Sequence, residues 1–193
     1  MFSFQASKFL KLAIAGIALA SQAAFAAPVL FSGELTASDP KFNRPFTTFT
    51  LSGAGTSVAY DVFRFYVSAN GIYSMESTSF NAAGSDTFLA LYQGAFNSAS
   101  PLANLLTVDD DTGVGALSLI NQALQANNQY FLVVTSYGNN QFGTYTGRFD
   151  TVSGGGQVTL GALVTNQVPE PGTLALLPLA ALGAALARRR KRA

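Results

Sequence analysis

Three consecutive aspartates, Asp109, Asp110 and Asp111, are the side chains of this 193-residue chain best suited to chemistry. Ca2+ takes about six to eight oxygen ligands and accepts both carboxylates and backbone carbonyls in flexible loops. Asp109 and Asp111 are alternate residues that can point into one site, and Gly113 permits a sharp turn beyond them. These two residues are therefore candidate Ca2+ ligands. A solvated acidic turn is the alternative, because the residue spacing of an EF-hand loop is not met.

Most other catalytic and metal chemistry is excluded, because the chain contains neither Cys nor His. Thiol nucleophiles, imidazole bases, His-based triads and Cys/His metal sites are therefore impossible. Paired carboxylates can serve a glycosidase, but no spacing in this sequence marks such a pair. Tyr92, Tyr137 and Tyr145 can stack on sugars, although aromatic residues in strands usually belong to the core. We expect no catalytic residue and a protein that is not an enzyme.

Hydrophobic periodicity predicts that the middle of the chain consists of strands. Apolar and polar residues alternate in several segments, and two nearly continuous apolar runs are typical of strands covered on both faces. Clusters of Gly, Asn, Asp and Ser separate these segments. This pattern predicts a single all-β domain over residues 27–167, an antiparallel β-sandwich. The predicted strands are residues 29–36, 46–51, 61–67, 73–78, 87–92, 130–135, 143–149 and 157–165, with a short strand and turn at 117–126.

The N-terminal segment has the organisation of a secretion signal. Lys8 and Lys11 precede an apolar run at residues 12–20, which is too short to span a bilayer. Ala24 and Ala26 then place small side chains at the two positions that signal peptidase reads. We expect a signal helix within residues 1–26 and cleavage after Ala26. A retained membrane anchor is the alternative.

The C-terminal segment, residues 168–193, has three parts in a fixed order. Val168, Pro169, Glu170 and Pro171 come first, and an uncharged apolar stretch at 172–187 follows. That stretch is shorter than the roughly 20 residues of a stable membrane span, so it fits a transient membrane-inserted helix. By the positive-inside rule, the cations after it stay in the cytoplasm and the domain before it lies outside. These cations are Arg188, Arg189, Arg190, Lys191 and Arg192.

This tail resembles the sorting signal of PEP-CTERM proteins, whose pattern is Pro-Glu-Pro, a short apolar helix and a terminal Arg cluster. The resemblance implies that exosortase, an integral-membrane transpeptidase, processes the tail. It also implies a Gram-negative host that exports polysaccharide. In this chain Pro169, Glu170 and Pro171 would be recognised, and residues 188–192 would be the basic stop. An ordinary tail anchor is the alternative.

Removal of both ends would leave an acidic domain. Between residues 27 and 168 there are nine acidic and four basic residues, whereas the whole chain carries a net charge of +1. Nucleic-acid binding needs a patch of Lys and Arg, so we expect no nucleic-acid partner. An anionic polysaccharide would need a bridging cation.

The central region also resembles the bacterial pre-peptidase C-terminal domain. The matching segments are residues 60–65, 85–92, 109–113, 128–134 and 143–145, in that order. The resemblance implies a jelly-roll-like sandwich with a binding, adhesion or folding role, and some of its relatives bind calcium in a comparable loop. Two functions follow as expectations. One is a non-enzymatic protein of the cell envelope or extracellular matrix, and the other is a calcium-dependent carbohydrate- or exopolysaccharide-binding module.

Overall fold

The computed structural model describes residues 26–163, and ten strands account for the regular structure of this segment. None of these residues forms a helix of the length and apolarity needed to cross a membrane. The two predicted terminal helices lie outside the described residues. The strands are β1 (Val29–Leu35), β2 (Lys41–Phe42), β3 (Val58–Val67), β4 (Gly71–Phe80), β5 (Thr87–Gln93), β6 (Leu105–Asp109), β7 (Leu119–Leu124), β8 (Tyr130–Ser136), β9 (Gly143–Ser153) and β10 (Val158–Leu160).

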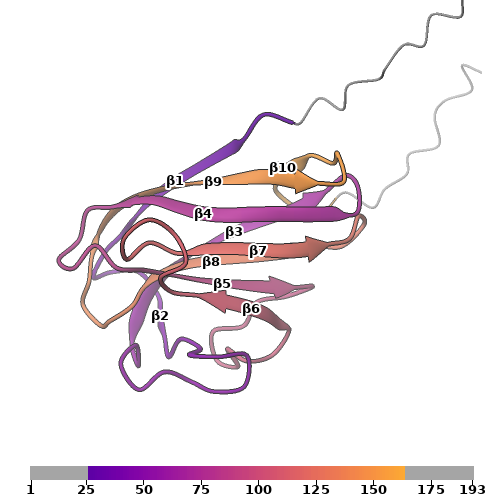
Figure 1. Ribbon diagram of the computed structural model, residues 1–193. Helices are drawn as coiled ribbons and strands as arrows, with labels where there is room; N and C mark the ends of the chain where they lie inside the picture. Colours follow the sequence, from indigo (N-terminus) through magenta and orange to yellow (C-terminus); the bar gives the residue numbers. More distant parts are fainter. Residues whose placement is uncertain (1–25, 164–193) are drawn as a thin grey trace, which may run out of the picture.

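The strands form two antiparallel sheets that lie one over the other (Figure 1). One sheet has the order β1-β9-β4-β7, and the other has the order β10-β3-β8-β5-β6 with β2 paired to β3. Side chains from both sheets form one apolar core, in which Phe65 of β3 packs against Phe149 of β9. The prediction of an all-β, antiparallel fold is therefore confirmed.

Burial along the strands follows the sequence pattern closely. Residues 87–92 are all buried, because β5 lies inside its sheet between β8 and β6 and is covered on both faces. In β9 the buried residues Tyr145, Gly147 and Phe149 alternate with exposed ones, as expected for a strand with one solvated face. The short strand predicted within 117–126 is β7.

Three strand predictions need correction. Residues 46–51 form no strand, because Phe46 donates to the carbonyl of Thr50 and the segment turns back on itself. The last strand is only β10, and Gly161 follows it with a φ of +117°, outside the range of extended backbone. The sequence pattern also missed β2 and β6, which are short edge strands.

Candidate cation site

Three aspartates from two segments meet where β5 begins and β6 ends. In the β5–β6 pair, Leu89 lies opposite Asp109, so the residue before β5 lies close to the residues after β6. Asp86 precedes β5, and Asp110 and Asp111 follow β6. Asp86 is fixed in place because its carbonyl accepts a hydrogen bond from the Tyr137 amide. Antiparallel pairing thus joins residues that are 24 positions apart in sequence.

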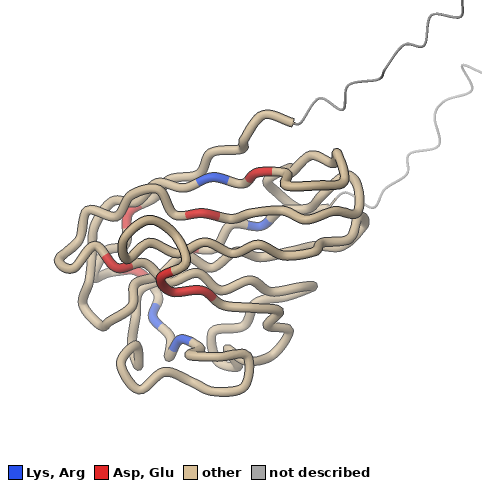
Figure 2. The backbone as a smooth tube through the Cα atoms, viewed as in Figure 1, with Lys and Arg blue, Asp and Glu red and all other residues tan. Residues whose placement is uncertain are grey.

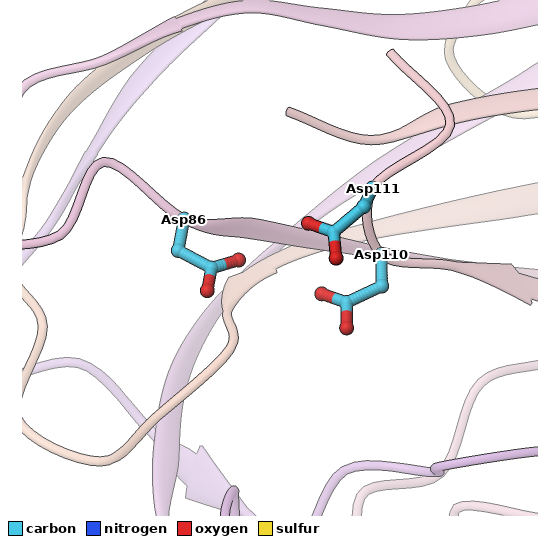
Figure 3. A group of neighbouring side chains, drawn as sticks. All are labelled: Asp86, Asp110 and Asp111. Carbon is cyan, nitrogen blue, oxygen red and sulfur yellow. The ribbon is translucent and has the colours of Figure 1, made fainter. Parts of the chain in front are cut away.

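The carboxylates of these residues converge on one small volume (Figure 3). One oxygen from each of Asp86, Asp110 and Asp111 lies within 4.8 Å of the other two. Asp86 and Asp110 are half-buried, and Asp111 is exposed. Oδ1 of Asp86 and Oδ1 of Asp110 are buried and accept no hydrogen bond from the protein. Two acceptor oxygens in this group are therefore unused.

Asp109, one of the two predicted ligands, has a different role. Its Oδ1 accepts hydrogen bonds from the amides of Thr112 and Leu119, and its Oδ2 accepts one from the Thr112 hydroxyl. Asp109 therefore holds the loop between β6 and β7 in shape. The structure brings Asp111 together with Asp110 and Asp86 in its place.

A buried cation, Arg44, lies behind the aspartates. Its side chain is fully buried, and its guanidinium lies 3.9 Å from the centre of the Phe88 ring and 4.7 Å from that of Tyr137. The guanidinium donates to the backbone carbonyls of Tyr137 and Pro45. Burial and the neighbouring carboxylates raise the pKa of Asp86 and of Asp110, and the charge of Arg44 offsets only part of this rise. One positive charge therefore offsets part of the three negative ones.

The remaining repulsion changes proton affinity at the site. Burial, followed by the charges of Asp111 and Asp86, raises the pKa of Asp110 to about 6. Burial and Asp111 also raise the pKa of Asp86. Ionised carboxylates are costly when partly removed from water and set beside one another. A bound cation would relieve this cost.

We expect the burial and mutual repulsion of these carboxylates to make the unfolding free energy depend on pH in calcium-free buffer. The folded pKa of Asp110 lies above its unfolded value, so its stabilising contribution is present at low pH and is lost as pH rises through about 6. The unfolding free energy of the wild type should therefore fall relative to that of Asp110→Asn between about pH 4 and 7. Urea denaturation in EDTA measures both proteins, and parallel pH profiles would contradict the assignment.

The donor set fits a hard cation. All three ligands are carboxylate oxygens, the type that Ca2+ prefers, and the chain offers no soft donor from Cys or His. Three side chains supply fewer oxygens than Ca2+ takes, so water and backbone carbonyls would complete the shell.

The structure accounts differently for the other residues singled out by the sequence. Tyr92 and Tyr145 are buried and donate to the Pro101 carbonyl and the Asp61 carboxylate, so neither is free to stack on a sugar. Tyr137 is half-buried against Arg44. Ala26 is the first described residue, and Ala24 and the whole tail from 168 to 193 lie outside the described part of the chain.

Comparison with known proteins identifies the tail. Residues 167–191 match the PEP-CTERM protein-sorting motif. No curated protein matches the chain. The match covers the three-part signal seen in the sequence, whereas the resemblance of the central region to the pre-peptidase domain stays a prediction. The chain therefore carries the sorting signal of an exported protein of the cell envelope or extracellular space, and exosortase processes this signal.

Proposed function

We propose that this protein is a non-enzymatic component of the cell surface or extracellular matrix. The sorting motif at residues 167–191 carries the proposal, because it follows the all-β domain in the chain. An N-terminal signal peptide directs export, and signal peptidase cleaves after Ala26. The apolar stretch at 172–187 enters the membrane transiently, and exosortase then acts at Pro169, Glu170 and Pro171.

The positions of the N- and C-terminal residues of the mature protein test this proposal. Mass spectrometry of the protein from its native host should give a mature chain that starts at Ala27 and lacks Arg188–Ala193. Glu170→Ala should cause unprocessed precursor to accumulate, since it alters the recognition motif. Glu34→Ala is a matched control, because it removes an exposed carboxylate of β1 far from the tail in sequence. Surface-exposed protein with an intact basic tail would refute the proposal.

A second candidate function is a calcium-dependent carbohydrate- or exopolysaccharide-binding module. The convergence of Asp86, Asp110 and Asp111 favours it. A cation there would fix the loops at one end of the domain and would let an acidic domain approach an anionic polymer. Thermal unfolding with calcium and with chelator tests the ion, and binding of an anionic polysaccharide in the same two conditions tests the ligand.

A further inference from the structure

The loop between β2 and β3 presents the most exposed aromatic residue of the described chain. Phe49 is 86% exposed and Phe46 is 58% exposed, and Leu51 beside them is 42% exposed. Exposed apolar patches that are rimmed by polar residues mark interaction sites in many proteins. Figure 1 shows this loop below β2.

The loop is well ordered by its own hydrogen bonds. Phe46 and Thr47 donate to the carbonyl of Thr50, and the hydroxyls of Thr47 and Thr50 bond to each other at 2.8 Å. Further along, the Ser57 amide donates to Asn139 of the β8–β9 loop at 2.8 Å. The base is fixed by buried Arg44. The backbone that carries the two rings is therefore held in place before any partner arrives, which lowers the entropy cost of ordering the loop on binding.

The loop and the two ends of the described chain, residues 26 and 163, lie at opposite ends of the domain. β3 runs from this loop to the opposite end of the sheets, where its last residue, Val67, pairs with Val158 of β10. Ala26 and Ala27 lie beside Val158, and Leu163 donates to Gln129 near the same end. The described chain therefore begins and ends at one end of the domain, and the β2–β3 loop lies at the other (Figure 1).

The chemistry of the loop favours a neutral partner. No charged residue lies between Pro45 and Tyr60, and Figure 2 shows the loop in tan beyond its first residues. A lipid surface is disfavoured, because interfacial loops add basic residues and Arg44 is fully buried. A second copy of the chain is also disfavoured. The exposed side chains offer on the order of a few hundred Å2, below the ~1,200 Å2 of a stable interface.

We propose that Phe46 and Phe49 form a stacking platform for a neutral glycan. The C–H face of a hexose ring is apolar with slightly positive hydrogens, so it is attracted to the negative face of an aromatic ring. The neighbouring threonine hydroxyls can exchange hydrogen bonds with sugar hydroxyls. This inference rests on the proposed function, because that function places the domain outside the cell. It adds the ligand class and the contact residues.

Affinity electrophoresis of the processed protein tests the platform, with dextran, hydroxyethylcellulose or galactomannan in the gel and EDTA throughout. At least one of these polymers should retard the wild type. Each of Phe46→Ala and Phe49→Ala should weaken binding about three- to tenfold, and the double variant more than tenfold. Phe49→Trp should retain binding. Matched controls are Leu30→Ala and Val114→Ala, which remove exposed apolar side chains elsewhere and should leave binding unchanged.

Several results would overturn the inference. These are retardation by none of the three polymers, equal retardation of wild type and double variant, or equal loss in the Leu30→Ala control. Sedimentation with phosphatidylcholine vesicles that depends on both phenylalanines would identify a lipid contact instead. A dimer abolished by the same double variant would identify a self-association surface instead. The masses of the mature ends of the double variant report separately on sorting, so failure of the platform and failure of the proposed function are distinguishable.

Discussion

Millimolar calcium is expected to stabilise the processed protein by about 2.7 kcal/mol, if the ion is present at a hundredfold excess over its Kd. The ion would bind carboxylates that converge only in the folded chain, because Asp86 is separated in sequence from Asp110 and Asp111. Extracellular calcium modules bind with Kd values on the order of 0.1 to 1 mM. Ten millimolar calcium reaches that excess if the Kd is about 0.1 mM, and it would stabilise the domain by about 1.4 kcal/mol if the Kd is about 1 mM. For a domain of this size the midpoint should rise by roughly 5 to 10 °C.

The variants for this experiment follow from the separate roles of the aspartates. Asp86→Asn/Asp110→Asn removes two ligand charges with little change of shape and should abolish the calcium shift. Asp109 is a poor choice, since its loss would break the hydrogen bonds that shape the loop. Asp150→Asn is the matched control, because it removes a carboxylate of β9 that pairs with Arg148 of the same strand and does not belong to the aspartate cluster. Its calcium shift should equal that of the wild type.

Magnesium distinguishes a site from general screening of the acidic domain. Mg2+ carries the same charge but requires near-ideal octahedral geometry and loses its water reluctantly. An equal rise in the melting midpoint with both ions would indicate screening. Equal melting midpoints of the wild type in calcium and in chelator would show that the cluster is a solvated acidic turn and binds no ion. A calcium shift that survives Asp86→Asn/Asp110→Asn would place the ion elsewhere.

The sequence predicted the fold class because most of its strands are regular. The alternation in residues 61–67 and the apolar run in 87–92 each follow from one physical requirement, that the core-facing side of a strand be apolar. The strands β2 and β6 were missed because they have only two and five residues, too few to show a clear alternation. The bent segment at residues 46–51 was mistaken for a strand because it is rich in Phe and Thr, which favour strands.

The candidate site was predicted only in part. The aspartate run pointed to the right loop, and Asp111 lies in the cluster. The sequence did not place Asp86 in this site, because its position depends on the pairing of β5 with β6, and β6 had not been predicted. The exchange of Asp109 for Asp110 has a local cause. Asp109 still belongs to β6, and its carboxylate satisfies amides in the following loop before any ion is considered. Sequence spacing shows which carboxylates are near one another but not which hydrogen bonds they already accept.

Gly147→Ala is expected to destabilise the domain by about 3 kcal/mol, at the upper end of the cost of overpacking a core. Gly147 in β9 lies opposite Phe31 in β1, and the Phe31 ring covers it. An added Cβ would lie 2.1 Å from Phe31 Cζ and 2.5 Å from the Glu76 carbonyl oxygen. The ring packs against Phe63 and Phe149, and the carbonyl belongs to the paired strand β4, so neither can move away cheaply. The midpoint should fall by roughly 10 °C.

A matched glycine and a double substitution make this prediction specific. Gly53 has no atom within 4 Å of an added Cβ and lies in an open loop, so Gly53→Ala should change the midpoint little. Phe31→Leu should cost less in the Gly147→Ala background than in the wild type, because a smaller side chain relieves the overlap. This coupling is measured by thermal or urea unfolding of the wild type, Gly147→Ala, Phe31→Leu and the double variant. Equal stability of Gly147→Ala and Gly53→Ala would show that the two sheets adjust to the added methyl. Additive effects of Gly147→Ala and Phe31→Leu would show that the added methyl does not overlap with Phe31.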